Sequence, residues 1–236
     1  MLRKAFIALS VAANLLVVAA IVWLLVGGGM RFVIGRFITP AHAQRVSHFE
    51  AFAAEPGDVV FLGDSITEGG RWEETLPGAR ARNRGIGGDT TTGVLARLEQ
   101  VSERRPAQVF LLIGTNDLFA GVPEAQIAEN VAAIITRLRR GSPEAQLFVQ
   151  SVLPRAADYR ARVESLNARL REIARDDGAT FVDLYPHFLD ARDGSIRDDL
   201  SNDELHLMGP GYRVWREQIA GYVRPSDAVR SPAALR

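Results

Sequence analysis

The chain has 236 residues, 28 lysines and arginines against 28 aspartates and glutamates, and no cysteine. This length suits one α/β domain plus an extension, and the balanced charge gives no basic field to suggest nucleic acid as a partner. The absence of cysteine excludes disulfides, a cysteine nucleophile, a thiolate metal site and a lipid-modified N-terminal cysteine.

The first predicted element is a membrane-spanning helix over residues 5–26. Ser10 and Asn14 are its only polar side chains, and about 22 helical residues span about 33 Å, enough for a bilayer core. Two basic residues precede the run, as they do in both an anchor and a signal peptide. The run exceeds the usual length of a signal h-region, so we expect a retained anchor. Cleavage after Ala43, in the small-residue pattern Ala-His-Ala, is the alternative.

The basic residues on the two sides of this span are evenly matched, so the positive-inside rule barely orients it. We expect a single-pass protein of the cell membrane, with its globular domain on the extracytoplasmic side. The predicted parts are an anchor over 1–30, a juxtamembrane connector over 31–57, a globular domain over 58–224 and a tail over 225–236. In the connector, the Thr39–Pro40 step should break any helix, and a short helix is expected at 48–54.

Apolar runs typical of strands alternate with amphipathic helical stripes through the globular domain. Strands are expected at 59–62, 81–86, 109–113, 147–153 and 180–184, and helices at 90–101, 123–138, 163–173 and 209–223. This alternation is typical of βαβ units, so we predict a mostly parallel sheet covered on both faces.

The first strand leads directly into Gly63-Asp64-Ser65. Its continuous apolar run indicates a strand buried on both faces, and Gly63 allows a sharp turn at its end. Ser65 then stands at the carboxyl end of the strand, where open α/β sheets place their ligands. Ser65 is therefore a candidate nucleophile; the alternative is a helix N-cap.

Two further loops end in groups that can donate hydrogen bonds. In Gly87-Gly88-Asp89, after the second strand, the glycine pair can point backbone N–H groups into a crevice. The Asn116 amide, after the third strand, can donate into the same crevice, as an oxyanion hole requires. The alternatives are a tight turn for the glycine pair and an Asx turn or N-cap for Asn116. No phosphate-binding glycine spacing is present.

Asp203-Glu204-Leu205-His206 lies just before the last predicted helix. A carboxylate three residues before a histidine can accept from its ring N–H, which leaves the other ring nitrogen free to take a proton from a serine. An ordinary surface pair is the alternative. The four histidines of the chain are scattered, without the spacing of a zinc site.

Together these blocks resemble the SGNH hydrolase superfamily, also called GDSL lipases and esterases. The resemblance is carried by Gly63-Asp64-Ser65, Gly88, Gly114-Thr115-Asn116-Asp117 and Asp203-x-x-His206. The stretches 83–91 and 206–212 resemble the branch with platelet-activating-factor acetylhydrolase-like and lysophospholipase-like proteins. The resemblance covers about residues 58–223, and the first block reads Gly-Asp-Ser-Ile rather than Gly-Asp-Ser-Leu.

The resemblance implies a flavodoxin-like three-layer α/β/α sandwich after the N-terminal transmembrane helix. It implies that Ser65 is the nucleophile, His206 the general base and Asp203 the residue that orients His206. The oxyanion hole would consist of the Ser65 N–H, the Gly88 N–H and the Asn116 side chain. No metal and no organic cofactor are expected.

We therefore expect a serine esterase that hydrolyses short-chain esters, above all O-acetyl esters, of a carbohydrate or lipid through an acyl-enzyme on Ser65. An SGNH-type O-acyltransferase acting on an envelope glycan would use the same residues. A catalytically inactive, membrane-tethered binding module is the alternative from another class. The expected partners are the ester substrate and the membrane.

Overall fold

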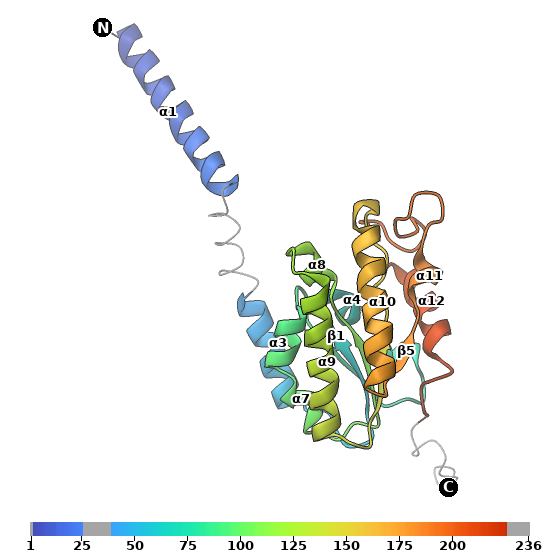
Figure 1. The fold of residues 1–236 in the computed structure, drawn as a ribbon. Helices are drawn as coiled ribbons and strands as arrows, with labels where there is room; N and C mark the ends of the chain where they lie inside the picture. The colour runs from blue at the N-terminus through green and yellow to red at the C-terminus, as the bar shows by residue number, and fades with distance from the viewer. Residues whose placement is uncertain (1, 26–38, 226–236) are drawn as a thin grey trace. The chain divides into compact units, whose positions relative to one another are not determined.

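The computed structural model describes residues 2–25 and 39–225 of the chain. The chain divides into two units, Met1–Ser47 and His48–Arg236. In the first unit, α1 spans Leu2–Leu25 (Figure 1). Its stretch Arg3–Trp23 is long and apolar enough to cross a membrane, a property that signal sequences share. The end of the predicted anchor, residues 31–38 of the predicted connector and residues 226–236 of the predicted tail lie outside the described residues.

Helix α3 spans Thr39–Ala51 and differs from the prediction for this segment. The Thr39–Pro40 step was expected to interrupt any helix, with a short helix only at 48–54. Instead the helix begins at Thr39. Pro40 falls in the first turn, where backbone N–H groups have no intrahelical acceptor, so its missing N–H costs no hydrogen bond.

The second unit is built on a five-stranded, fully parallel sheet in the order β2-β1-β3-β4-β5. Its strands are β1 Val59–Gly63, β2 Ala81–Gly85, β3 Gln108–Leu112, β4 Gln146–Gln150 and β5 Thr180–Val182. This is the flavodoxin-like order. The predicted fold class and the five predicted strands are confirmed.

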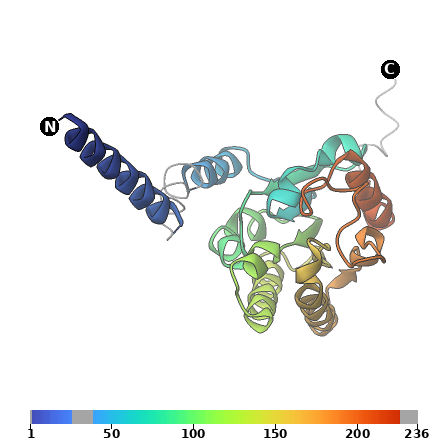
Figure 2. The ribbon, with the colours of Figure 1, turned by 90° about the horizontal axis from the view of Figure 1, so that it is seen from above.

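Helices follow each strand and cover both faces of the sheet. They are α4 Ser65–Glu68, α5 Trp72–Thr75, α6 Thr91–Ala96, α7 Glu99–Ser102, α8 Thr115–Phe119, α9 Glu124–Gly141, α10 Arg160–Asp176, α11 Tyr185–Phe188 and α12 Gly209–Ile219, with the 3₁₀ turn η2 at Ala157–Tyr159. Figure 2 shows α9 and α10 on one side of the sheet and α12 on the other.

Each face of the sheet has its own apolar core, because successive strand residues point to opposite faces. Val60 and Leu62 pack into the core that α6, α7, α9 and α10 complete. Phe61 points the other way and stacks on Trp72, with ring centroids 3.9 Å apart, and on Phe110 at 5.1 Å. Phe110 in turn stacks on Phe148 at 4.3 Å. This aromatic row ties β1, β3 and β4 together, at about 0.5–1.5 kcal/mol per pair beyond simple burial.

The helix predicted over 90–101 is interrupted at Arg97, so α6 and α7 are separate. The Arg97 side chain turns inward and pairs with Asp89 at 2.7 Å, with both side chains almost fully buried. The same guanidinium donates to the carbonyl oxygens of Gly63 and Arg84 at 3.1 and 2.9 Å. A buried charge must be paired and hydrogen-bonded. Arg97 makes these contacts at the position where α6 has ended and α7 has not yet begun.

The end of β1 is held closer to its neighbours than any side chain would allow. A Cβ atom at Gly63 would lie 2.2 Å from the Leu112 carbonyl oxygen and 2.3 Å from Thr67 Oγ1. Glycine is therefore required where β1 turns into α4. The turn places Ser65 at the carboxyl end of β1, the strand that has β2 on one side and β3 on the other. The strand order therefore changes direction at β1. Open α/β sheets bind ligands at this switch point.

Candidate active site

The predicted site residues come together at the carboxyl edge of the sheet, which Figure 2 shows from above. Ser65 follows β1, Gly88 follows β2 and Asn116 follows β3. His206 arrives on the loop before α12. Because parallel strands end at the same edge, segments far apart in the sequence meet there.

Ser65, His206 and Asp203 form a continuous hydrogen-bonded relay. Ser65 Oγ lies 3.0 Å from His206 Nε2, although the two residues are 141 positions apart. His206 Nδ1 lies 2.7 Å from Asp203 Oδ2. A proton on Nδ1 satisfies the carboxylate, so the Nε2 lone pair faces the serine hydroxyl. The arrangement can therefore move a proton from Ser65 to His206.

Asp203 is held by its own loop as well as by the histidine ring. Its Oδ1 accepts from the backbone N–H groups of His206 and Leu205, at 2.7 and 3.1 Å. Partial desolvation raises the pKa of Asp203, but the hydrogen bonds from the His206 side chain and from these two N–H groups outweigh it and lower the pKa to about 2. Asp203 is thus a carboxylate over the whole neutral range.

Ser65 is the first residue of the four-residue helix α4. Carbonyl groups of α4 and of the residues just after it accept hydrogen bonds from side chains of three other elements. Asn83 Nδ2 donates to the Thr67, Glu68 and Gly70 carbonyls at 2.9–3.1 Å. Trp72 Nε1 donates to the Thr67 carbonyl at 3.0 Å. Tyr212 Oη donates to the Ile66 carbonyl at 2.8 Å. The last carbonyls of a helix have no intrahelical partner, and these donors fix a helix too short to be stable alone.

Asp64 is the fully buried N-cap of α4. Its Oδ1 accepts from the Ile66 N–H at 3.0 Å, while its buried Oδ2 has no hydrogen-bond partner among the described residues. Desolvation raises the pKa of Asp64 to about 7, with smaller raising effects from Asp89 and Asp117 and lowering effects from the Ile66 N–H and His206. Two carboxyl groups near one histidine therefore differ: Asp203 is ionised, and Asp64 holds its proton up to about neutral pH.

The three predicted hydrogen-bond donors lie just beyond the carboxyl ends of three neighbouring strands, β1, β2 and β3. Asn116 Nδ2 donates one hydrogen to the Asp89 carbonyl at 2.8 Å, which orients the amide and leaves its second hydrogen available. Gly88 has φ +77°, a conformation that favours glycine. Within the described part of the chain, the backbone N–H groups of Gly88 and Ser65 donate to no protein acceptor. Such donors can stabilise a negative oxygen that develops during a reaction.

Two buried carboxylates hold the donor loops in place. Asp89 is paired with Arg97 at 2.7 Å. Asp117 accepts from the Thr91 hydroxyl at 2.6 Å and from the Thr91 N–H at 3.0 Å, which ties the start of α8 to the start of α6. The loops that carry Gly88 and Asn116 are therefore held in place by buried side chains.

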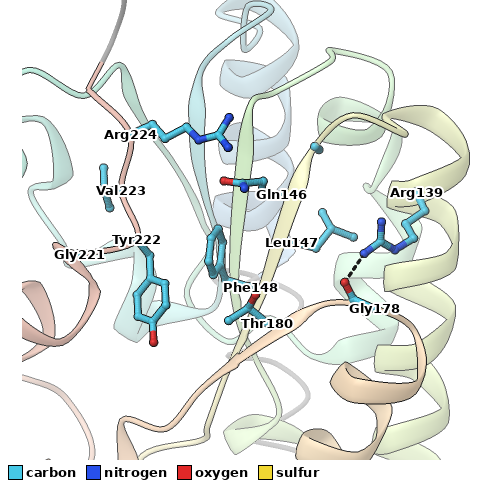
Figure 3. A pocket seen from close by; sticks show the side chains of 11 residues that line it. Arg139, Gln146, Leu147, Phe148, Gly178, Thr180, Gly221, Tyr222, Val223 and Arg224 are labelled. Carbon is cyan, nitrogen blue, oxygen red and sulfur yellow. Dashed lines mark hydrogen bonds between the residues drawn. The ribbon is translucent and has the colours of Figure 1, made fainter.

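The candidate site is open to solvent. The side chains of His206 and Asp203 are each 48% exposed, and Ser65 is half-buried. A cavity of about 540 Å³ lies elsewhere, at the amino ends of β4 and β5 (Figure 3). There Arg139 donates to the Gly178 carbonyl at 2.6 Å, a contact that serves the fold.

Sequence reasoning missed the residues that position the site rather than face it. The positioning roles of Asn83, Trp72 and Arg97 could not be predicted, because their partners are backbone carbonyl groups that no sequence pattern marks. An asparagine inside a predicted strand was the one available hint, since asparagine is depleted in strands. In the described part of the chain, no three histidine, aspartate or glutamate side chains gather in a way that could hold a metal.

The fold and the comparisons define a hydrolase that acts on ester bonds. The sequence matches the GDSL-like Lipase/Acylhydrolase family over residues 61–214. The chain belongs to this family, within the SGNH hydrolase superfamily, so the predicted resemblance is confirmed.

Named relatives agree with this assignment. Platelet-activating factor acetylhydrolase IB subunit alpha1 of Bos taurus is 33% identical over 166 residues, which cover 66% of this chain and 70% of that protein. A GDSL-like lipase from Bacteroides thetaiotaomicron superposes with a TM-score of 0.66 at 27% identity, over 77% of this chain and 96% of that one. An acetyl xylan esterase has the same fold, with a TM-score of 0.63 at 22% identity, over 71% of this chain and 100% of that one.

The buried carboxyl of Asp64 predicts a stability that falls with rising pH. With its pKa raised from 3.8 to about 7, the folded state binds more protons than the unfolded state between about pH 4 and 7, so ionisation destabilises the fold across that window. Asp64→Asn keeps the cap oxygen and cannot ionise. Its stability relative to the wild type, measured by urea unfolding from pH 4.5 to 7.5, should therefore rise with pH. Asp198→Asn, at an 89% exposed side chain, is the control, and parallel curves for wild type and Asp64→Asn would contradict the interpretation.

Proposed function

We propose that this protein is a serine esterase that hydrolyses short-chain esters, above all O-acetyl esters, of a carbohydrate or lipid. The observation that carries the proposal is the relay from Ser65 through His206 to Asp203, with contacts of 3.0 and 2.7 Å. A serine at hydrogen-bond distance from an oriented histidine is the recurring arrangement of an activated nucleophile.

In the proposed first half-reaction, Ser65 Oγ attacks the carbonyl carbon of the ester, and His206 Nε2 takes the hydroxyl proton. The carbonyl oxygen becomes an oxyanion and accepts hydrogen bonds from Ser65 N–H, Gly88 N–H and Asn116 Nδ2. The tetrahedral intermediate then collapses, and the bond to the alcohol oxygen breaks. His206 gives its proton to that oxygen, so the alcohol leaves and the acyl group stays on Ser65.

Water completes the cycle in the second half-reaction. His206 Nε2 takes a proton from a water molecule, whose oxygen attacks the acyl carbon. Collapse of the second intermediate releases the carboxylic acid and returns the proton to Ser65 Oγ. Asp203 remains ionised throughout, since its pKa is about 2, and it stabilises the imidazolium that forms in both steps.

The preference for short acyl groups and large alcohols rests on the relatives and on the openness of the site. One relative is named an acetylhydrolase and a solved neighbour is an acetyl xylan esterase. The 48% exposure of His206 and Asp203 leaves room for a bulky alcohol. An O-acyltransferase acting on an envelope glycan would share the first half-reaction and differ only in the acceptor.

We further propose that α1 is retained as a single-pass anchor in the cell membrane, with the hydrolase domain over 58–224 on the extracytoplasmic side. The stretch Arg3–Trp23 of α1 is long and apolar enough to cross a membrane, and a helix of that length and composition is more stable in lipid than in water. The intact mass of the protein in the membrane fraction tests this. A mature chain beginning at Gln44 and found in the soluble fraction would refute it.

Labelling with a fluorophosphonate, together with a panel of esters, tests the proposed function. The wild type should be labelled at Ser65 and hydrolyse acetyl esters faster than long-chain esters. Ser65→Ala should lose both activities while keeping the melting temperature of the wild type. Ser165→Ala, at an exposed serine of α10, is the matched control. Peptide mapping that finds the label on another serine would overturn the assignment.

Asn116 should act on the transition state rather than on substrate binding. Interactions made only with the oxyanion raise kcat and hardly change KM, and one such donor is worth on the order of 100- to 1,000-fold in kcat. Asn116→Ala should lose kcat by about that factor at nearly constant KM. The control is Asn130→Ala, since Asn130 Nδ2 donates to Thr91 Oγ1 at 2.8 Å behind the site. A lower melting temperature with normal kcat in Asn116→Ala would make Asn116 a turn residue only.

A further inference from the structure

Arg155 lies against the helix that carries Asn116 and has no acidic partner among the residues that the structure describes. Its Nη1 donates to the carbonyl oxygen and hydroxyl of Thr115, at 3.2 and 3.3 Å. Thr115 is the first residue of α8 and Asn116 the second. Because a helix of five residues is only about 7 Å long, the Arg155 guanidinium is a close neighbour of the proposed oxyanion hole.

Two aromatic rings flank this guanidinium. Arg155 Cζ lies 4.0 Å from the centroid of the Tyr159 ring and 5.7 Å from that of the Phe119 ring. Phe119 follows Asn116 by three residues, so both lie on the same side of α8. The Phe119 side chain is nevertheless 70% exposed. An exposed aromatic ring beside a candidate active site is apolar surface available to a ligand.

The backbone beneath these side chains is held by hydrogen bonds. Arg162 donates to the Leu118 and Val122 carbonyls at 2.7 and 2.8 Å and pairs with Glu124 at 2.5 Å. The Arg155 carbonyl accepts from the Ile196 N–H at 3.0 Å. The backbone segments that carry the ring and the guanidinium are therefore held in place, which lowers the entropy cost of binding a ligand there.

We infer that Phe119, Arg155 and Tyr159 form the subsite for the alcohol half of the ester and select an alcohol that carries a negative charge, a carboxylate or a phosphate. The inference rests on the proposed function. The charged Arg155 guanidinium can donate to either anion, and the Phe119 ring supplies an apolar face for a sugar ring or a glycerol chain. The acyl half does not fit here, because an apolar chain would remove water from the guanidinium without replacing its hydrogen bonds.

Matched pairs of acetyl esters test this inference. Acetylated methyl glucuronide and methyl glucoside differ in one carboxylate, and acetylglycerol phosphate and acetylglycerol differ in one phosphate. The wild type should prefer the charged member of at least one pair by about tenfold or more in kcat/KM, and the pair that responds identifies the source of the anion. Arg155→Gln should abolish this preference, mainly through KM, and Arg155→Lys should retain part of it. Phe119→Ala should raise KM for the preferred ester several-fold.

Arg140→Gln and Phe52→Ala, at an exposed arginine and at a phenylalanine that is 77% exposed, are the controls. A merely structural Arg155 would lower kcat for both members of a pair equally, and an unchanged preference in Arg155→Gln would overturn the inference.

Binding of the unacetylated alcohols, measured by calorimetry, separates this inference from the proposed esterase function. Tighter binding of the charged alcohol without hydrolysis of any ester would refute the esterase and keep the subsite. Ester hydrolysis without any charge preference would refute the subsite alone.

Discussion

The constraint on which the site depends is the placement of α4, a single helical turn that cannot hold itself together. One turn fixes several backbone dihedrals for one or two hydrogen bonds, so it is unstable without outside partners. Here β2 supplies Asn83, α5 supplies Trp72 and α12 supplies Tyr212, and all three donate to carbonyl groups of the segment 66–70. The turn into α4 then brings Ser65 to the edge of the sheet in one orientation.

The same contacts connect the two halves of the proposed relay. His206 lies on a loop, and loops are the less constrained parts of a fold. This loop is closed by the bridge between Ser201 and Leu207 and continues into α12, whose Tyr212 bonds to the Ile66 carbonyl at 2.8 Å. The segment that carries the base is therefore tied to the helix that carries the nucleophile, and the 3.0 Å contact between Ser65 and His206 follows from both.

The sequence predicted what depends on local pattern. Apolar runs predicted the five strands, and the Asp-x-x-His spacing predicted the contact between Asp203 and His206, because both are set within a few residues. It did not predict the break at Arg97 or the start of α3 at Thr39. The first depends on a buried pair with Asp89, and the second on the tolerance of a helix for proline in its first turn. Asn83 and Arg155 were missed for a related reason, since their partners are defined only once the chain has folded.

Environment, rather than residue type, assigns the two carboxyl groups near His206 to different roles. Asp203 is half-exposed and accepts hydrogen bonds from two backbone N–H groups of its own loop and from the His206 ring, so its pKa falls to about 2. Asp64 is fully buried beside Ser65, accepts one backbone hydrogen bond, and its pKa rises to about 7. A negative charge on Asp64 would be repelled by the buried side chains of Asp89 and Asp117. A neutral Asp64 therefore caps α4 without adding to that repulsion, while Asp203 supplies the charge that an imidazolium needs.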